Sequence, residues 1–228
     1  EKKKVEEITM KKIVRNVLVL ALAGLVLGAC SNNSSKSTAD SDAKHIGILQ
    51  YVEHESLTAA REGFVEQLEE DGYTDGKNIV IDYQNAQGDQ SNLQTISESL
   101  IKDNDIILGI ATPAAQSLVA ATSDIPVLFT AVTDPVSAKL VESMEKPGGN
   151  ATGTSDMSPI AKQVELLQTV MPDVKKVGIM YTTNERNSEV QVKEAEAAFK
   201  KAGIETLTKG ISSTNDVQDT AKSLMNQT

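Results

Sequence analysis

Short apolar segments alternate with segments of helical periodicity along most of this chain, and this alternation limits the folds that it can adopt. Two of the apolar segments, Asp105–Ile110 and Pro126–Ala131, have apolar side chains at most positions rather than at every second one. Strands of this kind are buried on both faces and occur in parallel sheets that helices cover on each side. The sequence therefore predicts an α/β fold of doubly wound parallel sheets.

Two successive sets of such elements predict two lobes. The first set places strands at His45–Gln50, Asn78–Tyr83, Asp105–Ile110 and Pro126–Ala131. The second set follows the loop Lys146–Asn150 and has two strands, Val177–Tyr181 and Ile204–Lys209, among helices. We therefore expect an N-terminal lobe over residues 45–150 and a C-terminal lobe over residues 151–228. Parallel sheets are usually wider than two strands, so we expect a truncated second lobe and a fragment of a longer protein.

The first thirty residues have the pattern of an export signal. Basic residues after Met10 are followed by an apolar run from Val17 to Leu27 and by small residues before Cys30. This order is typical of a secretory signal peptide with a lipoprotein cleavage box, which would leave Cys30 as the lipidated first residue. A transmembrane anchor is the alternative, but the run is shorter than the ~20 residues that a spanning helix needs. We expect a signal peptide over residues 1–29, with Met10 as an alternative start.

Charge and cysteine content restrict the partners of the exported part. The chain has a net charge of −10; without residues 1–29, which hold six basic and three acidic residues, 16 basic and 29 acidic residues leave −13. Such a surface argues against binding nucleic-acid phosphates. Cys30 is the only cysteine, which excludes a disulfide within the exported part. With residues 30–44 as a flexible polar tether, we expect a monomer anchored by lipid on the extracellular face of the cell membrane.

Polar residues gather where the predicted strands of the first lobe end, and open parallel sheets bind their ligands at these ends. The candidate ligand-binding residues there are Tyr51, Glu53, Thr112, Pro113, Ala114, Ala131, Thr133 and Asp134. Thr112–Pro113 and Asp134–Pro135 would each place a proline at the start of a helix behind a capping residue. The free N–H groups of such a helix start favour a carboxylate or phosphate. The alternative is that both residues only cap their helices.

Further candidates are expected across a cleft, in the second lobe. Ser155 and Asp156 precede another proline-containing helix start, and Asn184 follows the first strand of that lobe. Asp156 or Glu53 would neutralise a ligand ammonium group, although a solvated loop carboxylate explains each of them equally well. Tyr51 would stack on the ligand or, alternatively, pack in the core.

The sequence contains no pattern that requires catalysis, a metal or a cofactor. His45 and His54 have no partner at metal-ligand spacing. The chain also lacks a nucleophile elbow, a phosphate loop and the glycine pattern of dinucleotide-binding proteins. We interpret Pro147–Asn150 as a turn between the lobes. We therefore expect a protein that is not an enzyme and that uses neither metal nor cofactor.

Two segments carry a resemblance to a known family. Phe129–Pro135, followed by Pro147–Gly153, resembles the signature of the ABC-transporter substrate-binding lipoproteins typified by the streptococcal tryptophan-binding lipoprotein. Ala111–Gln116 is similar to the third strand-end loop of that family. The likeness runs from about Ile46 to the end of the chain. The later strands of the family's second lobe and a further ligand-binding loop have no counterpart in this sequence.

The resemblance implies a type I periplasmic-binding-protein fold, with two lobes that several crossing strands join. It also implies an amino-acid ligand, an aromatic one with tryptophan favoured, which hinge closure would trap and deliver to the permease subunits of an ABC importer. By this analogy Thr112, Ala114 and Thr133 would bind the carboxylate, with Tyr51 and Asp156 near the ligand body or amine. Two rivals stay open: a lipid-anchored hydrolase or transferase, which would need an activated nucleophile, and a sensory domain that signals to a receptor.

Overall fold

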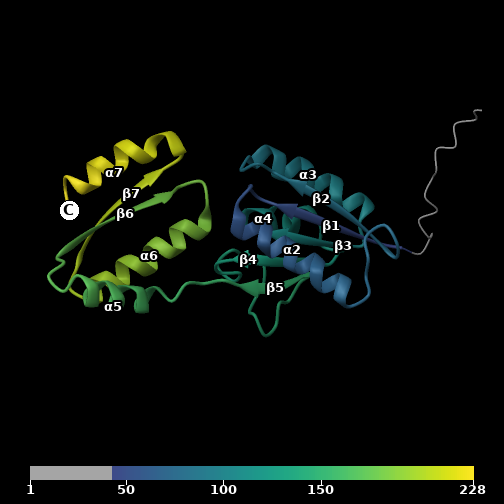
Figure 1. Ribbon diagram of the computed structural model, residues 1–228, viewed down its shortest axis with the longest axis horizontal. Coiled ribbons are helices and arrows are strands. Elements are labelled where there is room, and N and C mark those ends of the chain that lie inside the picture. Colours follow the sequence, from purple (N-terminus) through teal and green to yellow (C-terminus); the bar gives the residue numbers. More distant parts are fainter. Residues whose placement is uncertain (1–42) are drawn as a thin grey trace, which may run out of the picture. The chain divides into compact units, whose positions relative to one another are not determined.

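The structure, a computed structural model, describes residues 43–228 (Figure 1). The predicted signal peptide, Cys30 and most of the predicted tether therefore lie outside the described residues. Within residues 43–228, no helix has both the length and the apolar character that a membrane crossing requires. The elements in this range form two parallel sheets with helices packed on them, as the sequence predicts.

The first sheet has five parallel strands in the order β2-β1-β3-β4-β5. They are β1 (Lys44–Gln50), β2 (Ile79–Asn85), β3 (Ile106–Ile110), β4 (Val127–Val132) and β5 (Ala151–Ser155). Because β2 and β3 lie on opposite sides of β1, the strand order reverses at β1. Open parallel sheets bind their ligands in the crevice at the carboxyl ends of the strands beside such a reversal.

Helices cover both faces of this sheet (Figure 1). They are α2 (Glu55–Glu70), α3 (Gln90–Asp103) and α4 (Thr112–Ala121). Ile46 and Ile48 point to one face, where they pack with Phe64 of α2. Leu49 points to the other face and shares a core with Leu93 of α3 and residues of α4. Two apolar layers of this kind explain why the sequences of β3 and β4 are apolar at most positions, and they confirm the predicted doubly wound arrangement.

Strand β5 moves the predicted lobe boundary. Residues 151–155 are predicted in the second lobe, but Ala151 pairs with Val127 and Thr152 pairs with Leu128 of β4. The segment was not recognised as a strand because it lies at the edge of the sheet, largely exposed, and lacks an apolar run. The first lobe therefore extends to Ser155, and the boundary at residues 150 and 151 is wrong.

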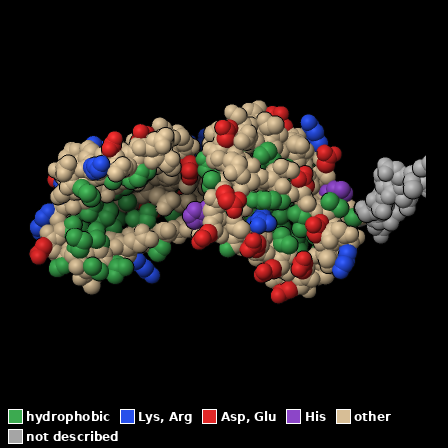
Figure 2. Space-filling model, turned by 45° about the horizontal axis from the view of Figure 1, so that its top comes forward, with side chains coloured by type: hydrophobic (Ala, Val, Ile, Leu, Met, Phe, Trp, Pro, Cys, Tyr) green, Lys and Arg blue, Asp and Glu red, His purple; other side chains and the backbone are tan. Residues whose placement is uncertain are grey.

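The second sheet within residues 43–228 consists of two parallel strands, β6 (Lys176–Thr182) and β7 (Glu205–Ile211). The associated helices are α5 (Ile160–Val170), α6 (Arg186–Lys201), the short 3-10 helix η1 (Thr214–Asp216) and α7 (Val217–Met225). Both predicted strands are present, with ends that differ from the prediction by one or two residues. On one side of β6, a hollow of 370 Å³ between α5 and α6 is lined by apolar residues that include Val164, Ile179 and Phe199 (Figure 2).

Candidate functional site

The loops that follow β1, β3, β4 and β5 are tied together along the carboxyl edge of the first sheet. The N–H of Tyr51 donates to the carbonyl of Ile110 at 3.2 Å, and the N–H of Ala111 donates to the carbonyl of Thr130 at 3.1 Å. The N–H of Asp156 donates to the carbonyl of Val132, the last residue of β4, at 3.0 Å. These bonds bring the predicted site residues of four strand ends to one edge.

The backbone at two of these strand ends adopts a conformation that costs energy. Ala111, after β3, has a φ of 80°, and Ala131, near the end of β4, has a φ of 55°. Left-handed conformations cost non-glycine residues about 1–3 kcal/mol and cluster at ligand sites. The turn at Ala111 brings α4 directly against β3. The two elements are so close that a Cβ added at Gly109 would lie 2.9 Å from the Cα of Ala115. The first turn of α4 is thereby held at the sheet edge.

The start of α4 has an uncapped end and a buried free hydroxyl. Ala111 occupies the N-cap position and no side chain caps the helix, so the alternative that Thr112 only caps α4 is wrong. Thr112 is 2% exposed, and its Oγ1 has no hydrogen-bond partner among the described residues. Pro113 and Ala114 follow it in the first turn, and Ala114 is fully buried. A buried hydroxyl without a partner costs about 1–3 kcal/mol, which is explained where a ligand supplies the partner.

Thr133 and Asp134, after β4, differ in how far the hydrogen-bonding capacity of their side chains is already used within the protein. Thr133 is 7% exposed, and its Oγ1 accepts a long hydrogen bond of 3.4 Å from Gln191 of α6. The Oδ1 of Asp134 accepts from the N–H groups of Val136 and Ser137, both at 3.1 Å. Asp134 therefore closes a turn, which is the usual local role of an aspartate before such a segment.

The segment after Asp134 corrects a second prediction. Residues 135–139 form hydrogen-bonded turns, not the helix expected from Asp134–Pro135. An aspartate followed by proline starts helices and turns alike, and only the surroundings distinguish the two. Here the Nε2 of Gln116 donates to the carbonyl of Ala138 at 3.0 Å, which attaches the turn to α4.

Ser155 and Asp156 lie on the first lobe, not on the second lobe as predicted, because β5 belongs to the first sheet. The Oγ of Ser155 donates to the carbonyl of Thr133 at 2.7 Å and accepts from the N–H of Met157 at 3.2 Å. Ser155 therefore fastens β5 to the β4 loop. Asp156 is exposed at the same edge.

Tyr51 is mainly a core residue. It is 8% exposed, belongs to the apolar cluster with Leu93, and donates its hydroxyl to the carbonyl of Gly88 at 3.4 Å. Burial raises the pKa of its phenol above the ordinary value, and the negative charges of Glu185 and Asp89 raise that pKa further. Tyr51 therefore remains a neutral side chain at physiological pH, with its backbone at the strand-end edge.

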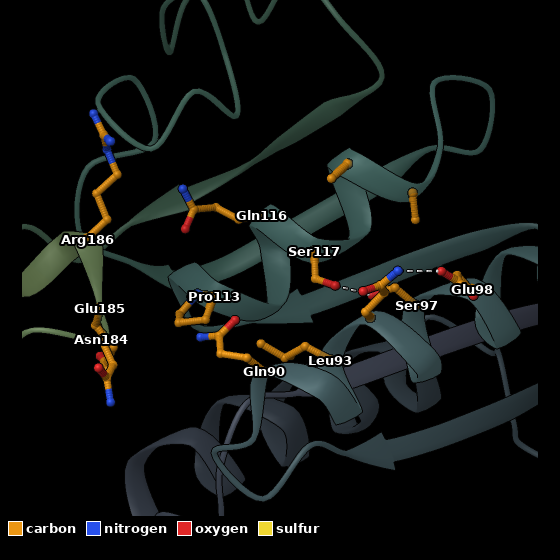
Figure 3. A pocket seen from close by; sticks show the side chains of 13 residues that line it. Gln90, Leu93, Ser97, Glu98, Pro113, Gln116, Ser117, Asn184, Glu185 and Arg186 are labelled. Carbon is orange, nitrogen blue, oxygen red and sulfur yellow. Dashed lines mark hydrogen bonds between the residues drawn. The ribbon is translucent and has the colours of Figure 1, made fainter. Parts of the chain in front are cut away.

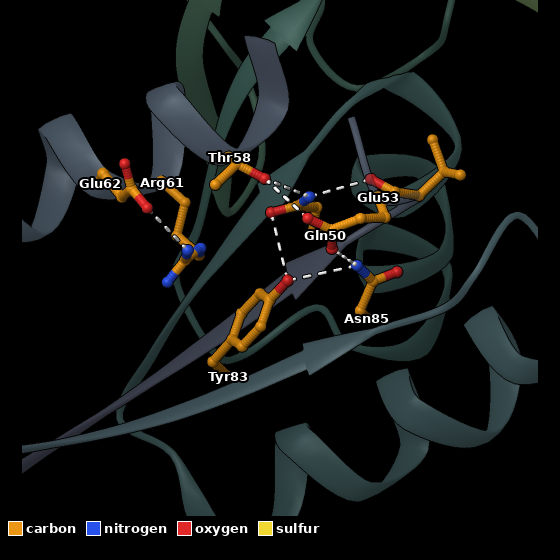
Figure 4. A network of polar contacts seen from close by, with 8 residues as sticks. Gln50, Glu53, Thr58, Arg61, Glu62, Tyr83 and Asn85 are labelled. Atoms are coloured by element: carbon orange, nitrogen blue, oxygen red, sulfur yellow. Dashed lines mark hydrogen bonds and ion pairs between the residues drawn. The ribbon is translucent and has the colours of Figure 1, made fainter. Parts of the chain in front are cut away.

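Glu53 and Asn184 are engaged within the protein. The two carboxylate oxygens of Glu53 accept hydrogen bonds from the Oγ1 of Thr58 at 3.2 Å and from the Nδ2 of Asn85 at 3.0 Å (Figure 4). The Nδ2 of Asn184 donates to the carbonyl of Ser212 at 3.0 Å. These bonds favour a structural role for Glu53, whose carboxylate has donors within the chain.

Pro113 and Asn184, both predicted site residues, line one pocket of 670 Å³ (Figure 3). Its polar lining includes Gln90 of α3, Gln116 of α4 and Arg186 at the start of α6. None of these three is among the predicted site residues, since a polar residue on a helix surface has no local pattern that distinguishes it from a solvated one. Within residues 43–228, no group of three or more His, Cys, Asp or Glu side chains is arranged to hold a metal ion.

The family model for ABC transporter substrate binding proteins matches residues 45–228, the whole of both lobes as described above. The chain belongs to this family. The two segments that carry the resemblance are neighbours in space, because Phe129–Pro135 contains the end of β4 and Pro147–Gly153 leads into β5, which pairs with β4. The family match confirms the resemblance noted in the sequence.

Individual relatives agree with the family match. A tyrosine-binding protein of Clostridioides difficile (strain R20291) is 45% identical, over 96% of this chain and 66% of that protein. The structure of an ABC domain in complex with L-Trp from Streptococcus pneumoniae is 44% identical with a TM-score of 0.78, over 81% of this chain and 63% of that one. The ligand-free, open structure of a substrate-binding protein with adhesive properties from Clostridium difficile is 47% identical with a TM-score of 0.61, over the same shares.

These comparisons bear on fold and on length. The structural neighbours have the type I periplasmic-binding-protein fold, so the predicted fold class is confirmed. This chain spans 66% of the length of the tyrosine-binding protein and 63% of each of the two solved chains named above.

Proposed function

We propose that this chain is the ligand-binding part of an ABC importer and that it binds a free L-amino acid with an aromatic side chain. Membership of the substrate-binding family supports a binding role without a chemical reaction. The name of one relative is tyrosine-binding protein, and another was solved with L-Trp, which supports an aromatic ligand. Tryptophan and tyrosine are therefore the two candidates to test.

The observation that carries the proposal is the first turn of α4. A helix start without a capping side chain directs free N–H groups and the positive end of the helix dipole outward, an environment that favours a carboxylate. Thr112 adds a buried hydroxyl that has no partner within the described part of the chain. The α-carboxylate of an amino acid would accept hydrogen bonds from both.

The same edge has a group suited to the other end of a zwitterion. Asp156 follows β5, and its side chain is exposed at the strand-end edge that α4 also reaches. We assign to it the pairing with the ligand ammonium, since Glu53 already accepts hydrogen bonds from Thr58 and Asn85. Thr133, on the loop between these two groups, would contribute a second hydroxyl to the carboxylate.

The proposal includes a location and a transport step. A lipid on Cys30 would hold a monomer on the extracellular face of the cell membrane, and the order of basic, apolar and small residues before Cys30 supports this. Closure of the two lobes over the ligand would create the surface that the permease subunits recognise. Desolvated contacts inside the closed cleft would supply the affinity.

Calorimetric titration with L-tryptophan, L-tyrosine and tryptamine tests the ligand class. Tryptamine has the indole ring and the amine of tryptophan but lacks the carboxylate. We expect at least one of the two amino acids to bind, and tryptamine to bind about 100-fold more weakly or not at all, because hydrogen bonds to a charged group are worth about 1.5–3 kcal/mol. Equal affinities for tryptamine and L-tryptophan would contradict the proposal that the start of α4 binds the ligand carboxylate.

A further inference from the structure

Five polar side chains form a hydrogen-bonded ring beneath the loop that joins β1 to α2 (Figure 4). The members of this ring are Gln50, Glu53, Thr58, Tyr83 and Asn85. Its bonds run from Gln50 to Thr58 at 3.4 Å and from Thr58 to Glu53 at 3.2 Å. The circuit closes from Asn85 to Glu53 at 3.0 Å, from Asn85 to the Tyr83 hydroxyl at 3.2 Å, and from that hydroxyl to Gln50 at 3.4 Å. The ring thus joins three elements: β1, β2 and the first turns of α2.

Gln50 connects the ring to the backbone of the loop. It is the last residue of β1 and is fully buried. Its Nε2 donates to the carbonyl of Val52 at 2.9 Å, the shortest bond that this side chain makes. Buried amides require partners, and Gln50 finds all of its own in the loop and the ring. The path of the chain from Tyr51 to Glu53 is therefore held from below.

The backbone of this loop is also hydrogen-bonded along the carboxyl edge of the first sheet. The N–H of Tyr51 donates to the carbonyl of Ile110, the residue before Ala111 and the turn into α4. The carbonyl of Tyr51 accepts from the N–H of Gly88 at 2.8 Å. A displacement of the loop would therefore move the backbone next to the first turn of α4, where we place the ligand carboxylate.

We propose that the ring of Gln50, Glu53, Thr58, Tyr83 and Asn85 is a positioning network that sets the β1–α2 loop against the ligand cleft. This inference rests on the proposed function, since it concerns the same site. Each bond of the ring is long or partly exposed, so no single one holds the loop, but together they restrict Glu53 and Val52 to one arrangement. A precise site depends on such supporting residues that do not touch the ligand.

The ring also gives Glu53 a role different from the predicted neutralisation of the ligand amine. A carboxylate at this position accepts from Thr58 and Asn85 at the same time, whereas a ligand ammonium would compete for the same oxygens. Asn85 supplies the donor that pairs with the Glu53 carboxylate. Its Nδ2 donates into the ring, while its Oδ1 accepts from the N–H of Gln87 at 2.8 Å.

The substitution Asn85→Asp in the full chain tests the network. It keeps the size of the side chain and the acceptor for Gln87, but it places a second carboxylate against Glu53, and like charges at this distance repel. We expect the affinity for L-tryptophan or L-tyrosine to fall by about ten-fold, a typical coupling within a hydrogen-bonded network. The double variant Glu53→Gln with Asn85→Asp exchanges donor and acceptor between positions 53 and 85, but it does not replace the donor that Asn85 supplies to the Tyr83 hydroxyl. We therefore expect it to recover most of the lost affinity, to within about three-fold of the original protein.

Amide hydrogen exchange supplies a readout that does not need a ligand. In Asn85→Asp, the segment 51–54 should exchange faster than in the original protein, and the double variant should restore its protection. Unchanged affinity and unchanged exchange in Asn85→Asp would overturn the positioning role. A loss that the double variant does not restore, in step with a lowered melting temperature, would also overturn it in favour of a merely structural role. If the original protein binds neither amino acid, the proposed function fails, while the exchange measurement still decides whether the ring holds the loop.

Discussion

Thr112 has a buried hydroxyl for which the described part of the protein supplies no hydrogen-bond partner, so its burial destabilises the folded protein without ligand. Its hydroxyl lies at the start of α4 without a partner in the described part of the protein. Other predicted site residues use their polar atoms locally: Asp134 closes a turn, Ser155 fastens β5 and Glu53 belongs to the ring. At the scale of single residues, Thr112 is the predicted site residue whose bonding capacity is most clearly unused.

Thr112→Val separates recognition from stability. Valine has nearly the same shape as threonine but lacks the hydroxyl, so we expect the dissociation constant for the proposed amino-acid ligand to rise about 10- to 100-fold. The free energy of unfolding without ligand should not fall, since the substitution removes a buried polar group that has no partner. Calorimetric titration and denaturant unfolding measure the two effects.

Thr112→Ser is the matched control, because serine keeps the hydroxyl and loses only a methyl group. Its affinity should stay closer to that of the original protein than the affinity of Thr112→Val. Equal affinities of the valine variant and the original protein would show that the hydroxyl does not contact the ligand.

At the scale of elements, the packing of β4 against β5 depends on the absence of a side chain at Gly153. A Cβ built there would overlap the carbonyl oxygen of Phe129, a backbone atom that cannot rotate out of the way. Gly153→Ala should therefore destabilise the protein by about 1–3 kcal/mol, because β5 must move away from β4. The midpoint of urea unfolding measures the loss.

Gly63 in α2 provides the contrasting substitution. A Cβ at Gly63 would have no heavy atom within 4 Å, and helix interiors prefer alanine to glycine by about 1 kcal/mol. Gly63→Ala should stabilise the protein, while Gly153→Ala destabilises it. A neutral Gly153→Ala would mean that β5 is free to shift, and that the β4 and β5 segments of the family signature are not tightly packed.

At the scale of the whole molecule, anchoring stays a prediction from residues outside the described range. If Cys30 carries the lipid, Cys30→Ser should move the protein from the membrane fraction to the medium or to a soluble fraction, with ligand affinity unchanged. Immunoblotting of cell fractions measures this distribution. Retention of the serine variant in the membrane would instead favour the alternative of a spanning anchor.

The strands and helices could be predicted because their signals are local. Strands buried on both faces are apolar at most positions, and the helices between them have apolar residues at helical spacing, so the sequence alone predicts the doubly wound lobe. The strand ends then indicated Thr112 and Thr133, because parallel strands bring their carboxyl ends to one edge. Periodicity and strand direction are both properties of neighbouring residues.

Other features depend on contacts between residues that are distant in the chain, so they could not be predicted from local sequence patterns. Residues 151–155 became a strand because β4 presents a free edge to them, and the Asp134 segment became a turn that Gln116 holds in place. Likewise, the free hydroxyl of Thr112 and the bound carboxylate of Glu53 are indistinguishable in sequence, since a polar side chain does not encode whether a donor lies within reach. The sequence alone determined most of the strands and helices and the strand ends at which a ligand would bind, whereas long-range packing determined where β5 pairs and which polar atoms remain available to a ligand.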